Sequence, residues 1–127
     1  MGKCSRRSGH QNSVYIARLC GVAVNIYQGA AGPLRRPLET AQHIHGQDGM
    51  GDIGLELGEN TATGLNAANA IVDAVHSSAE PLEVITLGPL TNIALALRLD
   101  PSILHRIRRI TIRGWRWRRS SKRLCAL

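Results

Sequence analysis

The chain has 127 residues, enough for one small domain, and 43% of them are hydrophobic. It contains no Phe, and its only two Trp residues lie together near the C-terminus, so we expect an aliphatic core. Three cysteines without metal-type spacing suit neither a zinc site nor a disulfide framework, and they fit a reducing cytoplasm. We expect neither a signal peptide nor a membrane span, because no apolar run approaches the length that either needs.

The net charge of +7 raises the question of a nucleic acid or an acidic membrane as partner. Six of these positive charges lie in the last 15 residues, which contain no acidic residue. The body of the chain is therefore almost neutral, and its basicity belongs to the tail. The charges of the tail are Arg113, Arg116, Arg118, Arg119, Lys122 and Arg123.

In the first half of the chain, the apolar spacing predicts a helix from Asn12 to Cys20, ended by Gly21 as a C-cap. The next six residues, VAVNIY at 22–27, are β-rich and bounded by glycine, which predicts a buried strand. From Gln28 to Glu59 the sequence is rich in glycine and has no sustained period. A loop of this length is uncommon in a compact domain unless it is functional or disordered.

The second half alternates helices with short apolar strands. The spacing predicts helices over 61–75, 90–99 and 101–107, with Pro89 in the first turn of the second, and strands over 82–87 and 109–112. This alternation predicts an α/β domain, part of an open, mostly parallel sheet with flanking helices, over residues 1–112. Residues 113–127 change character abruptly and are expected to lie outside that fold. A reading-frame shift is our hypothesis for their origin.

One candidate site is the loop TAQHIHGQDGMG at 40–51, which combines His43, His45 and Asp48 with three glycines. Histidine exchanges protons near neutral pH, and glycines let a loop bend over a ligand. Taken alone, such histidines are more often solvated loop residues. A metal pair is conceivable, but two ligands make no site without further partners.

The second candidate site is the turn from Leu87 to Asn92, which ends a predicted strand and begins a helix. Ligands bind outside the carboxyl ends of strands in open α/β sheets, so this turn could offer the Leu87 carbonyl to a ligand or metal. The alternative is that Gly88 and Pro89 only end the strand.

The third candidate is the tail, where Trp115 and Trp117 alternate with arginines that could neutralise phosphates while the rings stack on bases. Basic ends more often bind polyanions without specificity, so a selected nucleic-acid role is the weaker reading.

Taken in order, these segments resemble the inosine-uridine-preferring nucleoside hydrolase family. The resemblance rests on VNIYQGAAG, on the H-G of HIHGQDGMG, on VITLGPLTNIALALRLDP and on IRRITI, and it covers about a hundred residues. It implies an open α/β sheet with the active site at the carboxyl ends of the strands. It also implies ribonucleoside hydrolysis to base and ribose, with one Ca²⁺, an aspartate as general base and acid assistance to the leaving base.

The resemblance carries over few site residues. His45 matches the family's active-site histidine and is the catalytic candidate, while the backbone carbonyl of Leu87 matches a main-chain calcium ligand. Asn12 matches a helix asparagine and is expected to be structural. No substrate-binding residue is matched: Lys3 stands where a sugar-binding asparagine is expected, and Arg113-Gly114-Trp115 replaces Met-Gly-Gly.

From these departures we expect a truncated family domain that is inactive alone and does not bind Ca²⁺, because the family's aspartate-rich motif would precede Met1 and its later site residues are lost. The expected partners are a ribonucleoside substrate and further copies of the chain, without membrane association. Two alternatives stay open: a small basic nucleic-acid-binding protein acting through its tail, and a non-catalytic subunit fragment. The preference for purine or pyrimidine is not predicted.

Overall fold

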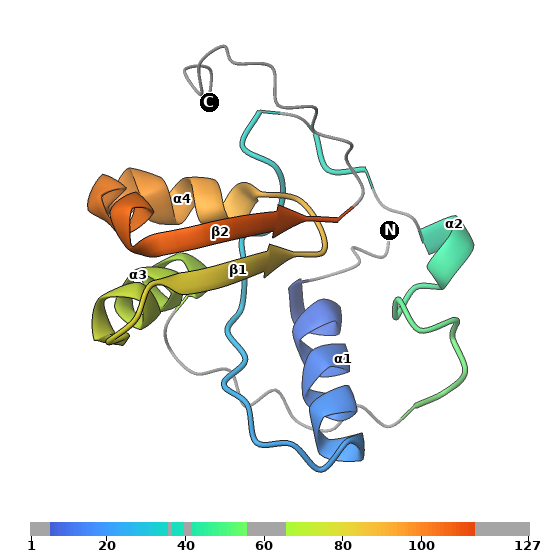
Figure 1. Ribbon diagram of the computed structural model, residues 1–127. Coiled ribbons are helices and arrows are strands. Elements are labelled where there is room, and N and C mark those ends of the chain that lie inside the picture. Colours follow the sequence, from blue (N-terminus) through green and yellow to red (C-terminus); the bar gives the residue numbers. More distant parts are fainter. Residues whose placement is uncertain (1–5, 36, 40–41, 56–65, 114–127) are drawn as a thin grey trace.

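The computed structural model describes residues 6–35, 37–39, 42–55 and 66–113, and the side chains from Gly9 onward. Its elements confirm an α/β arrangement (Figure 1). They are the helices α1 (Arg6–Leu19), α2 (Gln42–His45), α3 (Ala67–Ser77) and α4 (Thr91–Leu99), the 3₁₀ helix η1 (Pro101–Arg106), and the strands β1 (Leu82–Thr86) and β2 (Ile107–Ile112). The predicted tail beyond Arg113 lies outside the described residues.

The two strands form a parallel pair, as predicted. Glu83 pairs with Arg109 and Thr86 with Ile112, after an irregularity between Leu82 and Glu83. The chain crosses from one strand to the other through α4 and η1, which is the connection that a parallel pair requires. Both strands therefore end on the same edge of the sheet, where their arrowheads lie in Figure 1.

Local chemistry sets the ends of the helices. The helix α1 begins earlier than predicted, at Arg6, and ends at Leu19, one residue before the predicted Cys20; Gly21, with a φ of +65°, caps it as predicted. There the amides of Gly21 and Val22 donate to the carbonyls of Arg18 and Ala17, each at 3.0 Å, which is a Schellman cap.

Asparagine and aspartate cap two of the later helices. The Asn66 side chain accepts the Asn69 amide before α3, and Asp100 accepts the Ser102 amide before η1. The part of the predicted third helix at 61–65 lies outside the described residues. The expectation that Pro89 lies in the first turn of α4 is wrong by a short distance, because Leu90 has a non-helical ψ of 12° and the helix starts at Thr91.

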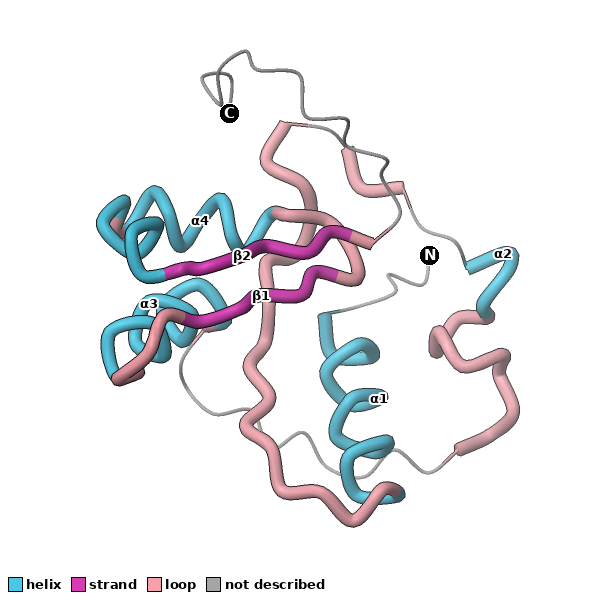
Figure 2. The backbone as a smooth tube through the Cα atoms, viewed as in Figure 1, coloured by secondary structure: helices cyan, strands magenta, loops and turns pink. Residues whose placement is uncertain are grey.

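The predicted strand at 22–27 is wrong. Figure 2 draws this segment as loop, and a single parallel bridge, between Gln28 and Asn66, follows directly after it. Val22 and Val24 are exposed. A strand needs a neighbour to pair its amides and carbonyls, and the described residues place none beside this segment.

The core is small and aliphatic, as predicted. Ala68 and Val75 of α3 pack with Ala96 of α4 and Ile103 of η1, and partly buried side chains such as Leu82 surround them. The sheet is less completely covered, since Ile85 of β1 is 70% exposed. Among the described residues, none of the helices combines the length and the apolar composition of a membrane span.

Candidate functional site

The loop that carries His45 begins with the short helix α2 and turns sharply at Gly46. The Gly46 amide donates to the Gln42 carbonyl at 2.9 Å, and Gly46 has a φ of +79°. A Cβ on Gly46 would lie 2.8 Å from Cγ of Asp52 and 2.9 Å from its backbone nitrogen. Both the backbone angle and this close approach require glycine.

Two aspartates hold the turn that follows. Asp48 Oδ1 accepts the amides of Met50 and Asp52 at 2.7 and 3.0 Å, and Asp52 Oδ1 accepts the amides of Gln47 and Asp48 at 2.8 and 3.1 Å. The amides of Met50 and Asp52 hold the pKa of the Asp48 carboxyl below its usual value. Each carboxylate therefore fixes the backbone beside the other, and both are engaged in the turn itself.

The turn brings the chain back to His45. The Gly51 amide donates to the His45 carbonyl at 2.7 Å, so the backbone of His45 is fixed while its side chain is exposed. His43 is exposed as well and lies two positions away on α2. Side chains two apart on a helix do not face each other, so the two imidazoles do not converge.

Leu87 lies where the sequence placed it, just beyond the carboxyl end of β1. The last ladder bond runs from the Arg113 amide to the Thr86 carbonyl at 2.9 Å, and the chain then turns through Gly88 and Pro89 into α4. In Figure 1 the strands point toward the side of the molecule on which α2 lies. No hydrogen bond or ion pair joins His45 to Leu87 in the part of the chain that the structure describes.

Asn92, in the first turn of α4, ties a distant loop to this edge. Its Oδ1 accepts the Ala30 amide at 2.9 Å, and a Cβ on Gly29 would lie 2.6 Å from its Nδ2. One residue earlier in that loop, the Gln28 carbonyl accepts the Ala67 amide at 2.9 Å. The loop at 28–30 is thereby attached to the starts of both α3 and α4.

Two hollows flank the contact between Ala30 and Asn92. One, of about 370 Å³, lies beside Pro89 and is bordered by Leu38 and Glu39. The larger, of about 660 Å³, lies between the start of α3 and α4 and reaches Arg98. Neither His45 nor Leu87 lines either hollow, so neither of these two cavities coincides with the predicted site residues.

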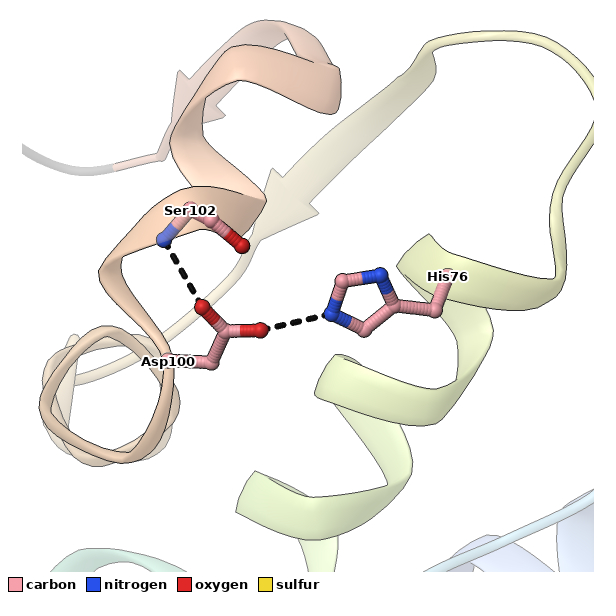
Figure 3. A network of polar contacts seen from close by, with 3 residues as sticks. All are labelled: His76, Asp100 and Ser102. Atoms are coloured by element: carbon pink, nitrogen blue, oxygen red, sulfur yellow. Dashed lines mark hydrogen bonds and ion pairs between the residues drawn. The ribbon is translucent and has the colours of Figure 1, made fainter.

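Another polar cluster joins α3 to the start of η1 (Figure 3). His76 Nε2 of α3 lies 2.6 Å from Asp100 Oδ2, and Asp100 Oδ1 accepts the Ser102 amide at 2.8 Å. The hydrogen bond from Ser102 and the contact with His76 lower the pKa of Asp100 to about 2. The imidazole faces the carboxylate that caps η1, which marks the cluster as structural.

Comparison with known proteins agrees with the order of these elements. The family described as inosine-uridine preferring nucleoside hydrolase matches residues 1–115. The chain belongs to this family. It is 35% identical over 113 residues to the non-specific ribonucleoside hydrolase RihC of Klebsiella pneumoniae, and 37% identical over 108 residues to the inosine-uridine preferring nucleoside hydrolase of Crithidia fasciculata.

These matches cover 89% and 82% of the chain but only 37% and 34% of the two relatives. Matches to solved structures likewise cover most of this chain and about a third of the other protein. A purine-preferring ribonucleoside hydrolase from Gardnerella vaginalis matches with a TM-score of 0.74 and 30% identity over 83% of this chain and 35% of its own. A plant nucleoside hydrolase matches in fold, with a TM-score of 0.77 and 24% identity over 87% of this chain and 36% of its own.

The calcium ion that the resemblance implies for the family can be compared with the donors that this chain offers. The described residues contain no group of three or more His, Cys, Asp or Glu side chains that could hold a metal ion. Ca²⁺ takes about six to eight oxygen ligands, and the Leu87 carbonyl offers one. These residues by themselves therefore do not fit a calcium site.

Several of the residues that shape the site were not predicted. Asp48 was predicted only as a carboxylate in the loop, Asn92 was named only as the last residue of the second candidate turn, and Asp52 was not singled out. The D-G-M-G-D spacing held a signal for the turn, because aspartate side chains accept amides a few residues onward. The contact of Asn92 with Ala30 spans 62 residues and leaves no comparable local signal.

Proposed function

We propose that this chain is part of a ribonucleoside hydrolase, which cleaves the N-glycosidic bond of a ribonucleoside to give a free base and ribose. The observation that carries the proposal is the family match over residues 1–115, together with relatives named as ribonucleoside hydrolases. Within the chain, the His45 loop is the segment that would face the nucleoside.

The reaction adds water across one bond. The bond between C1′ of the ribose and the nitrogen of the nucleobase breaks, and the water oxygen bonds to C1′. A general base takes one proton from the water, and a general acid gives one proton to the departing nucleobase. An exposed imidazole on a fixed backbone, as at His45, suits donation of that second proton. The family's metal would supply the activated water, and the donors among the described residues do not by themselves complete a site for it.

The same geometry argues that the 127-residue chain does not catalyse alone. The two carboxylates that follow His45 in its own loop, Asp48 and Asp52, each accept two backbone amides and are committed to the turn. A general base must lie across the glycosidic bond from the acid, and these two carboxylates cannot leave the turn without unfolding it.

The first experiment assays the purified chain on inosine and uridine, following ribose release with added calcium and with a chelator. The Klebsiella hydrolase is the positive control. We expect no release above the enzyme-free rate. Calcium-dependent release that the chelator abolishes would contradict the inactivity of the chain.

The second experiment tests the role of His45 directly. Residues 42–52 of this chain replace the matching loop of the Klebsiella hydrolase, and kcat is compared with and without His45→Ala. A general acid contributes about 10²- to 10⁴-fold, so we expect a loss of that order for inosine. The matched control is His43→Ala in the same graft, which should change kcat by less than about threefold. Equal effects of the two substitutions would remove His45 from the mechanism.

A further inference from the structure

Asn12 connects the His45 loop, residues 42–52, to the helix α1. Its Nδ2 donates to the backbone carbonyl of Asp48 at 2.8 Å, across 36 residues of sequence. Asn12 lies on α1, whose own position is fixed by a second long-range bond, from His10 Nε2 to the Ile26 carbonyl at 3.2 Å. The loop thus has a side-chain anchor on a 14-residue helix.

Asp48 takes part in several hydrogen bonds of the turn, so holding it in place holds the whole turn. Its amide is accepted by Asp52, its carboxylate accepts two later amides, and its carbonyl accepts Asn12. The turn built on Asp48 then closes on His45 through the Gly51 amide. Holding the Asp48 carbonyl therefore holds the backbone that presents the His45 imidazole.

The approach of Asn12 to the loop depends on the adjacent glycine. A Cβ on Gly49 would lie 3.4 Å from Asn12 Nδ2, and Gly49 has a φ of +76°. This backbone conformation is one that glycine adopts without strain. The turn therefore brings its backbone close enough for a short side chain on α1 to reach it.

The Asn12 side chain contacts the loop through its donor, the Nδ2 group. Its Oδ1 is buried and accepts no hydrogen bond, a condition that within the described residues it shares only with His10 Nδ1. A buried acceptor without a partner lowers stability. Rotating the amide would place Oδ1 against the Asp48 carbonyl, which also only accepts, so the bond to the loop fixes the orientation.

We infer that Asn12 is a positioning residue, which acts through the Asp48 carbonyl to set the place of the His45 loop against α1. This goes beyond its expected structural role in the helix. The positioning of the loop rests on the contacts above, and only its consequence for catalysis rests on the proposed function.

The test compares Asn12→Leu, which keeps a similar volume but has no donor, with wild type in the full chain. The readouts are the hydrogen-exchange rate of the Gly51 amide and the pKa of Asp48, both by NMR under conditions where the chain is folded. We expect Gly51 exchange to accelerate about tenfold and the Asp48 pKa to rise toward the usual value of an aspartate, because the turn opens more often.

Two controls separate positioning from general stability. Ser13→Ala removes a hydrogen bond within α1, from Ser13 Oγ to the Gly9 carbonyl, and Val75→Ala weakens the core away from the loop. Both should leave the Asp48 pKa unchanged, even where Val75→Ala lowers the unfolding midpoint more than Asn12→Leu does. If Asn12→Leu leaves Gly51 exchange and the Asp48 pKa at wild-type values, or if Val75→Ala shifts them equally, the inference is wrong.

These outcomes do not depend on activity. A loop that loosens in Asn12→Leu, combined with a graft that is insensitive to His45→Ala, would keep the positioning role and remove the proposed function. A graft that depends on His45, combined with an unchanged loop in Asn12→Leu, would do the opposite.

Discussion

The imidazole of His76 on α3 lies 2.6 Å from the carboxylate of Asp100, the residue at which α4 ends and η1 begins. This contact joins three helices that surround the core. Arg106 Nη2 adds a second connection, donating to the Ser78 carbonyl at 2.6 Å just beyond the end of α3. These polar contacts join the same helices that the core residues join in the interior, namely Ala68, Val75, Ala96 and Ile103.

The first prediction concerns the acid stability that Asp100 confers. In the unfolded chain its carboxyl takes up a proton near pH 3.8, and in the folded chain near pH 2. Between these values the unfolded state binds more protons, so the stabilisation is full above about pH 4 and is lost as the pH falls toward 2. Asp100→Asn should flatten this part of the stability profile.

Urea unfolding followed at about pH 5, 3 and 2 measures the effect. Asp73→Asn, which removes an exposed carboxylate from α3, is the matched control and should keep the wild-type slope. A wild-type midpoint that does not fall between about pH 5 and pH 2 more steeply than that of Asp100→Asn would contradict the lowered pKa.

The second prediction contrasts two isoleucines with opposite burial. Ile103 is 0% exposed and Ile85 is 70% exposed. Ile103→Ala should lower the free energy of unfolding by about 2–5 kcal/mol, because it leaves a cavity among α3, α4 and η1. Ile85→Ala should change it by less than about 0.5 kcal/mol. Denaturant unfolding of both variants decides, and similar losses would mean that the exposed sheet face is covered in solution.

The predictions made from sequence succeeded where the signal was local. The apolar periods of α3 and α4 and the β-rich runs of β1 and β2 were readable because each element reports its own buried face. The segment at 22–27 carried the same β-rich signal but is a loop, since a strand also depends on a neighbour that local sequence does not supply.

The same distinction holds for the candidate site. His45 and Leu87 came from motifs whose order resembles the family, and the structure puts Leu87 at the carboxyl end of β1 as that order implies. The anchors Asn12 and Asn92 act across 36 and 62 residues. Such contacts depend on how α1 and α4 pack against distant loops. They could not be predicted from any period or spacing in the sequence.

The third prediction concerns the glycine that ends α2. Gly46→Ala should open the His45 loop, because the new Cβ would lie within 2.9 Å of the backbone nitrogen and side chain of Asp52 and the φ of +79° is strained for alanine. Gly54→Ala is the control, with a φ of +74° and nothing within 4 Å of its Cβ. The measurement is amide exchange at Asp48 and Asp52. Equal loosening in the two variants would attribute the effect to backbone strain alone.

The fourth prediction concerns the contact between Gly29 and Asn92. Gly29→Ala should destabilise the chain, because its Cβ would lie 2.6 Å from Asn92 Nδ2 and 3.2 Å from Oδ1. The Asn92 side chain would have to move, and its bond to the Ala30 amide would break. We expect Gly29→Ala to lower the free energy of unfolding by about 1–2 kcal/mol.

A double-mutant cycle separates this clash from a general effect of alanine at position 29. Asn92→Ala removes both the hydrogen bond and the obstacle, so adding Gly29→Ala to it should cost clearly less than in the wild-type background, with a coupling energy of about 1 kcal/mol. Asn92→Asp keeps an acceptor for Ala30 and should lie closer to wild type than Asn92→Ala. Additive losses in the cycle would show that the two side chains do not meet in solution. The loop at 28–30 would then be held by the Gln28 carbonyl and α3 alone.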